Sequence, residues 1–207
     1  MATRFRSWRT GESAPPRDRV LDRSARRIDL DWYLEHTGSI LPSFSVLRTG
    51  MLDRVRDDGP PFAVDLRINQ DYDVFVRAIH LGQAVRTSWS GGSYRMHEAG
   101  ISANGSATWL CRSMANGELE RWFDARGEVG LANRFRQASG TASRSAARHL
   151  WRRRAAGDRA VASRLLLDDL ARNRDPRSLL VLMALALGVD QRAKSIPRGD
   201  ARFKAPD

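Results

Sequence analysis

Hydrophobic and polar residues alternate along two stretches in the first half of the chain. Ile28, Leu30, Trp32 and Leu34 are separated by mainly acidic residues, and the same alternation recurs over 62–68. A period of two is the pattern of a strand that has one face buried and one face in water. The sequence therefore predicts a half-buried strand in each stretch.

A short helix is predicted between these two strands. Phe44, Leu47, Met51 and Val55 recur every three or four residues, and Gly59 follows as a stop signal. This spacing places the four apolar side chains on one face of a helix.

Residues 72–81 fit two structures. They are rich in β-branched and aromatic residues, as strands are, yet Phe75, Ala78 and Ile79 also share one helix face. Because a clean alternating stretch precedes them, a hairpin is the preferred interpretation here.

Two glycine-containing pairs, Gly91-Gly92 and Asn116-Gly117, each separate two apolar stretches. Asn-Gly favours a type I′ turn because both residues tolerate a positive φ. Together with the earlier strands, these signals predict an antiparallel β-meander with one inserted helix over 27–125. The additional strands are expected at 84–89, 94–98, 108–114 and 118–123.

The pattern becomes helical in the last third of the chain. Gly157-Asp158 ends one amphipathic helix and begins the next. Asp175-Pro176 then places an acidic cap before a proline at the first helical position. The segment Leu179–Leu187 is apolar on every side, which predicts a last helix buried in the middle of the core.

These elements define an α+β fold: an antiparallel β-meander with one inserted helix, followed by two or three C-terminal helices, the last buried. The hydrophobic fraction of 42% is sufficient for a core. The predicted organisation is a basic flexible arm, a single α+β domain with a β-rich and a helical part, and a loose tail. Their bounds are 1–27, 28–190 (β-rich 28–137, helical 141–190) and 191–207.

The positive charge is concentrated in two segments. The chain has a net charge of +11, and 33 of its 35 basic residues are arginine. Residues 1–27 carry +5 and 141–164 carry +6, whereas 28–140 carry −2. A codon bias gives the same arginine excess, but a guanidinium group also binds phosphate in a bidentate way. This segregation of charge points to a polyanionic partner.

The best defined basic cluster lies on the first of the C-terminal helices. Three arginines recur at i, i+4 and i+8, and two more follow directly. Contacts to phosphates would give low sequence specificity and a steep dependence on salt. We therefore expect a non-catalytic nucleic-acid-binding protein of an architectural or coat type. The expected contact residues are Arg144, Arg148, Arg152, Arg153 and Arg154, with Arg4, Arg6 and Arg9 from the arm.

Other interpretations stay open. Basic clusters also attract anionic lipid headgroups, so a membrane-surface binder is one alternative. A small basic ribonuclease or toxin is another, with His80 or His97, Glu98 and Arg95 as acid–base candidates. A subunit that docks on an acidic protein is a third. The basic face could also be merely solvated, and the chain could form homo-oligomers.

Catalytic and cofactor motifs are missing from the sequence. Cys111 is the single cysteine, which excludes an internal disulfide and a cysteine-based zinc site. His97-Glu98 begins the zinc motif HExxH, but Ile101 stands where the second histidine is required. The patterns GxxxxGK[ST], GxGxxG and GxSxG do not occur. We therefore predict no metal, no cofactor and no catalytic residue, and an enzyme is the less expected class.

The sequence shows no secretory signal peptide, because the first ten residues lack an apolar stretch. The longest apolar run, 179–189, has 11 residues. A membrane-spanning helix needs about 20. The expectation is a soluble, intracellular protein.

Overall fold

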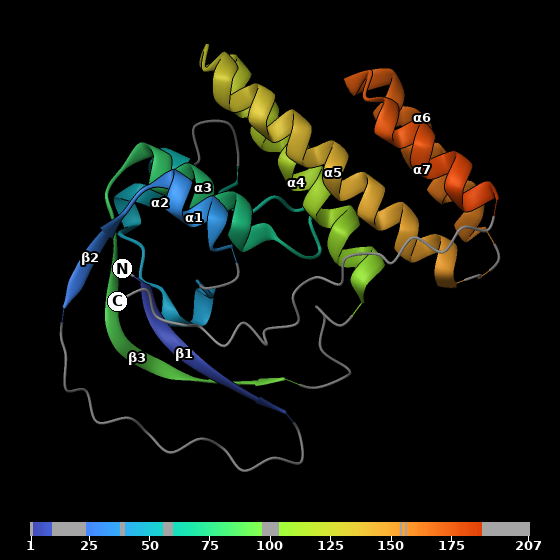
Figure 1. Ribbon diagram of the computed structural model, residues 1–207. Coiled ribbons are helices and arrows are strands. Elements are labelled where there is room, and N and C mark those ends of the chain that lie inside the picture. Colours follow the sequence, from blue (N-terminus) through green and yellow to red (C-terminus); the bar gives the residue numbers. More distant parts are fainter. Residues whose placement is uncertain are drawn as a thin grey trace. The chain divides into compact units, whose positions relative to one another are not determined.

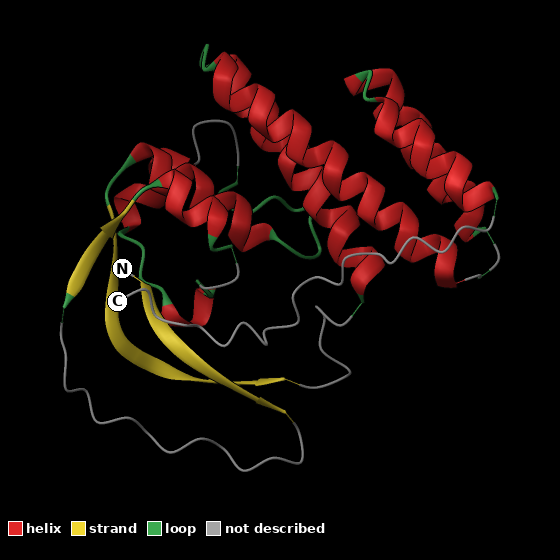
Figure 2. Cartoon of the chain, in the orientation of Figure 1, coloured by secondary structure: helices red, strands yellow, loops and turns green. Residues whose placement is uncertain are grey.

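The computed structural model describes residues 2–9, 24–37, 40–55, 60–96, 104–153, 155 and 157–187, with the backbone alone for 2–9 and 88–96. Within these residues the chain is mostly helical with one small sheet (Figure 2). This confirms the predicted α+β class. The chain divides into two compact units, Met1–Gly100 and Ile101–Asp207, and each is described by itself.

The first unit contains the sheet. Its elements are β1 (Ala2–Arg9), β2 (Ala25–Ile28), α1 (Leu30–Glu35), the 3-10 turn η1 (Pro42–Phe44), α2 (Thr49–Val55), α3 (Gln70–Leu81) and β3 (Ala84–Met96). The strand order is β1-β3-β2. β1 is parallel to β3, and β2 is antiparallel to it, from the pair Ala25–Thr87 to the pair Ile28–Ala84 (Figure 1). The long strand β3 is therefore covered on both edges by the N-terminal part of the chain.

Part of the core of the first unit forms where α1 packs on α3. Asp29 caps α1 by accepting a hydrogen bond of 2.8 Å from the backbone N–H of Trp32. Tyr33 is 2% exposed. Its ring lies 6.1 Å from that of Tyr72 and meets the ring of Phe75 edge-on at 6.2 Å. The aromatic contacts between α1 and α3 thus hold the helices together.

Three predicted strands in this unit are absent at the expected positions. The strand that contains Ile28 ends at that residue, and the helix α1 follows. Asp29 caps this helix, and Tyr33 is its buried residue, whereas the alternating pattern predicts that Trp32 and Leu34 are buried. Residues 62–68 form turns, and Val64 is 80% exposed. The segment 72–81 forms the helix α3, which corrects the preferred hairpin.

Two further differences concern β1 and β3. The pair Gly91-Gly92, which the sequence predicts to form a hairpin turn, lies inside the single strand β3. Residues 2–9 pair with β3 as a strand, where the sequence predicts part of a loose arm. Ladder hydrogen bonds to β3 supply the order that the local sequence of 2–9 does not indicate.

The second unit is helical. It contains α4 (Gly105–Ala125), α5 (Val129–Arg153), α6 (Asp158–Asn173) and α7 (Pro176–Ala186). α4 packs along α5, α6 packs on α5, and α7 packs on α6 (Figure 1). The last helix begins as predicted, because the Asp175 side chain accepts a hydrogen bond of 2.9 Å from the Arg177 N–H and Pro176 follows the cap.

The predicted hairpin around Asn116-Gly117 is wrong. Both residues lie buried in the middle of α4, a helix capped by Asn104 through a 3.2 Å hydrogen bond from the Ala107 N–H. An added Cβ at position 117 would make an ordinary contact, at 3.6 Å, with the Arg172 guanidinium of α6. The same helix packs along α5 over its length. Tertiary packing of α4 therefore outweighs the local turn preference.

The core of the second unit has two parts. Between α4 and α5, the rings of Phe123 and Phe135 stack at 5.2 Å, and Trp122 meets Phe123 edge-on at 4.8 Å. Where α5, α6 and α7 meet, a second cluster packs around Leu150 and Leu166. Its other buried members are Ala147, Ala162, Val181 and Leu185.

The last helix is buried on one face only. Ser178, Val181 and Leu185 are buried, whereas Leu180 is 60% exposed and Met183 is 52% exposed. The sequence predicts burial all round, because every side of this helix is apolar. α5 and α6 cover one side of α7 and leave the other in water.

Candidate nucleic-acid interface

The candidate interface lies at the C-terminal end of α5. Arg148, Arg152 and Arg153 occupy the last turns of this helix, together with His149. Positively charged side chains are favoured there, because the helix dipole places partial negative charge at a C-terminus. The structure thus brings three of the eight predicted contact residues together on described turns of one helix.

Arg144, the first arginine of the predicted row, lies inside the helical unit. It is 6% exposed and donates a hydrogen bond of 2.8 Å to Asp169 Oδ2. It also pairs with Asp175 at 3.1 Å and donates to Thr141 Oγ1 at 3.1 Å. Its guanidinium group is occupied by these partners, so we remove Arg144 from the interface that the sequence predicts.

Arg148 and His149 both sit among other cations. Burial lowers the pKa of Arg148, and the positive charges of Arg144 and Arg152 lower it further. Burial likewise lowers the pKa of His149, with a further contribution from Arg152. Neighbouring positive charge at this end of α5 therefore adds to the effect of burial on both groups.

Arg153 is positioned by two contacts. Its side chain is 52% exposed, and its Nε lies 3.3 Å from Asp158 Oδ2 at the start of α6. Its Nη1 donates to Ser106 Oγ at 3.3 Å in the first turn of α4. Arg152 is exposed on the same turn. The end of α5 thus combines an exposed arginine with a second one that two neighbouring helices hold in place.

Arg159, which the sequence does not single out, belongs to the same region. The Arg159 guanidinium lies 5.5 Å from the centre of the Trp151 ring, a cation–π arrangement. The His149 ring packs on Gly105, where an added Cβ would lie 2.9 Å from its Cε1. The only local signal for Arg159 is its place in the basic segment 141–164.

The side chains of the remaining predicted contacts are not among those that the structure describes. Arg154 lies outside the described residues. Arg4, Arg6 and Arg9 belong to β1, for which the structure describes the backbone. They are therefore residues of a strand on the first unit, whereas the arginines of α5 belong to the second.

Among the acid–base candidates of the ribonuclease alternative, the structure describes the side chain of His80, which lies in the last turn of α3. Arg95 belongs to the part of β3 described by its backbone, and His97 and Glu98 lie outside the described residues. Cys111 is buried as a free thiol. Within the part of the chain that the structure describes, no group of three or more His, Cys, Asp or Glu side chains is arranged to hold a metal ion.

The length and the hydrophobicity of the helices decide whether one of them could cross a membrane. Among the helices of the described ranges, none is both long enough and apolar enough to cross a membrane. Comparisons of the chain with protein families, with curated proteins and with solved structures give no match.

Proposed function

We propose that this chain binds the phosphate backbone of a nucleic acid, without catalysis, through the C-terminal end of α5. Arg148, Arg152 and Arg153 are the proposed contacts, and Arg159 extends the same basic region. Contacts of this kind are made to phosphates and carry little sequence information. An architectural or coat-type role, in which many copies cover one nucleic acid, is consistent with such binding.

The observation that supports the proposal most directly is the grouping of Arg148, Arg152 and Arg153 on the last turns of α5. Burial lowers the pKa of Arg148 and of His149, and the nearby charge of Arg152 adds to the effect for both. A phosphate placed beside Arg148 and Arg152 would offset the repulsion between their charges. Each phosphate contact would also release condensed counterions, which is the main source of affinity in such complexes.

The position of Arg153 adds a geometric argument. Asp158 and Ser106 fix its side chain from α6 and α4, at 3.3 Å in each case, while about half of it remains exposed. A pre-positioned guanidinium loses less conformational entropy when it binds a phosphate.

The test is a salt titration of binding to a short fluorescent oligonucleotide, single-stranded and double-stranded. The variant Arg152→Gln/Arg153→Gln should flatten the plot of log K against log salt by about one unit for each arginine–phosphate pair that it removes. A matched control, Arg121→Gln/Arg164→Gln, removes the same charge from side chains that are 65% and 85% exposed elsewhere in the second unit. This control should keep the slope of the natural chain.

Three outcomes would contradict the proposal. The first is no binding to either oligonucleotide at low salt. The second is an equal effect of both double variants, which would show a response to net charge alone. The third is binding to anionic vesicles in the absence of oligonucleotide binding, which would favour a lipid surface as the partner.

A further inference from the structure

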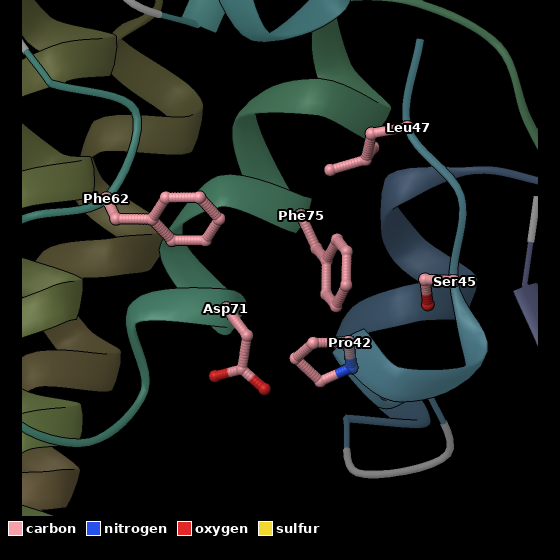
Figure 3. A pocket seen from close by; sticks show the side chains of 6 residues that line it. All are labelled: Pro42, Ser45, Leu47, Phe62, Asp71 and Phe75. Atoms are coloured by element: carbon pink, nitrogen blue, oxygen red, sulfur yellow. The ribbon is translucent and has the colours of Figure 1, made fainter. Parts of the chain in front are cut away.

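The first unit contains a small pocket that the proposed function does not use. It lies beside η1 and the start of α3 and has a volume of about 140 Å³. Figure 3 shows its lining side chains, two phenylalanine rings among them and a single charged group. The lining residues are Pro42, Ser45, Leu47, Phe62, Asp71 and Phe75.

The aromatic walls of the pocket differ in rigidity. Phe75 is 6% exposed and is fixed from behind by the edge-on contact with Tyr33. Phe62 is 43% exposed and comes from the turn region before α3. Figure 3 shows the two rings on different sides of the pocket. One wall is therefore held in the core, and the other is accessible to a ligand.

Asp71 supplies the charge. It lies in the first turn of α3, where the helix dipole favours a carboxylate. Asp73, two residues later, is bonded to Arg77 at 3.2 Å. The Asp71 carboxylate, by contrast, has neither a hydrogen bond nor an ion pair among the residues that the structure describes.

The second polar group of the pocket is also an acceptor. The Ser45 hydroxyl donates its hydrogen to the carbonyl oxygen of Leu41 at 2.7 Å, so only its lone pairs remain for a ligand. The pocket thus offers two oxygen acceptors and two aromatic faces. All four attract a cation with N–H donors, and none provides a donor for an anion.

We propose that this pocket binds an alkylguanidinium group, as carried by an arginine side chain or a free organic cation. A guanidinium is planar, stacks on aromatic rings and presents several N–H donors to a carboxylate. A short alkyl stem would contact Pro42 and Leu47. The proposal concerns residues of the first unit and is independent of nucleic-acid binding by α5.

The test is a titration of the protein with propylguanidinium, followed by amide chemical shifts and by calorimetry. Propylurea is the matched neutral ligand, since it has nearly the same shape and no charge. We expect saturable binding of propylguanidinium in the millimolar range and none of propylurea. A blocked Gly-Arg-Gly peptide, compared with the free cation, distinguishes a protein side chain from a small molecule as the source.

Two variants probe the assigned groups. Asp71→Asn should weaken binding at least about tenfold, because it removes a charge-assisted hydrogen bond. Phe62→Ala should weaken it about threefold, because it removes one cation–π interaction. Asp53→Asn, a change of the same charge at an exposed position of α2, should leave the affinity unchanged.

Unchanged thermal unfolding of each variant would show that folding is intact. This is expected because Asp71 has no hydrogen bond or ion pair with the residues that the structure describes, and Phe62 is partly exposed. Equal affinity for propylurea and propylguanidinium would overturn the proposal. Full binding by Asp71→Asn would also overturn it, as would the lack of saturable binding by the natural chain.

Discussion

Arg144 on α5 and Asp169 on α6 are hydrogen-bonded at 2.8 Å, with their side chains 8% and 2% exposed. Asp169 also accepts hydrogen bonds from Ser178 on α7 and from Asn173. Asp175 pairs with the same guanidinium at 3.1 Å. One buried arginine therefore connects three helices of the second unit and is a structural residue, despite its place in a basic helix.

Removal of Arg144 should destabilise the second unit strongly. Arg144→Met leaves the carboxylate of Asp169 buried without its counter-charge, which costs about 3–5 kcal/mol. Urea unfolding followed by circular dichroism measures this decrease. The control Arg164→Met removes a guanidinium that is 85% exposed and 3.9 Å from an exposed Asp168, so its effect should stay within about 0.5 kcal/mol. Similar decreases for both variants would contradict a structural role for Arg144.

Gly140 should tolerate no side chain, because α6 approaches it closely. An added Cβ would overlap the carboxylate of Asp169 and lie 2.9 Å from Asn173 Nδ2. We expect Gly140→Ala to lower the free energy of unfolding by about 1–3 kcal/mol, as overpacking does. Gly130→Ala is the matched control on the same helix, where nothing lies within 4 Å of the new Cβ. It should be neutral or stabilise by less than about 1 kcal/mol, and a decrease equal to that of Gly140→Ala would exclude the overlap as the cause.

Glu120 on α4 should also stabilise the second unit through buried hydrogen bonds. It is 7% exposed, and its carboxylate accepts hydrogen bonds from Arg136 on α5, at 2.8 Å, and from Arg172 on α6. The hydrogen bond from Arg136 and the charge of Glu120 raise the pKa of Arg136.

Glu120→Gln should cost about 1–3 kcal/mol, because two charge-assisted hydrogen bonds are weakened. Thermal unfolding compared with Glu118→Gln provides the measurement. Glu118 is 44% exposed and pairs with the exposed Arg121, so its change should be near zero. Equal unfolding temperatures of the Glu120→Gln and Glu118→Gln variants would contradict a stabilising role of Glu120.

His149 should make stability depend on pH. Burial, with a contribution from Arg152, lowers its pKa in the folded state below the usual value near 6.5. Between these two pKa values the unfolded chain binds more protons than the folded one. The stabilisation is therefore complete above about pH 6.5 and is lost as the pH falls through the folded-state pKa.

The measurement is the urea midpoint at intervals between pH 8 and pH 5. The natural chain should lose stability below about pH 6.5, and His149→Gln should lose less over the same interval. Parallel curves for the two proteins would show that another group is responsible.

Predictions from the sequence were most accurate where local backbone chemistry decides the structure. Gly157 has a φ of 82° and precedes α6, and Asp175 caps α7. These signals depend on a few neighbouring residues, so they can be recognised in a single sequence.

Local signals fail where packing overrides them. Asn116-Gly117 favours a turn, but both residues are buried inside the 21-residue helix α4. A glycine costs a helix only about 1 kcal/mol, which long-range packing readily exceeds. Likewise, the alternation after Ile28 favours a strand, whereas contacts of Tyr33 with α3 select a helix.

The sequence by itself determined that the charge is segregated and that the arginines of α5 recur every four residues. It could not determine which of them faces water, since Arg144, Arg148 and Arg152 are equivalent in spacing. The tertiary structure decided this by placing Asp169, 25 residues away, against Arg144, which is buried, while Arg152 is exposed. Burial of Arg144 with a counter-charge depends on α6, and the sequence pattern of α5 does not indicate where α6 packs.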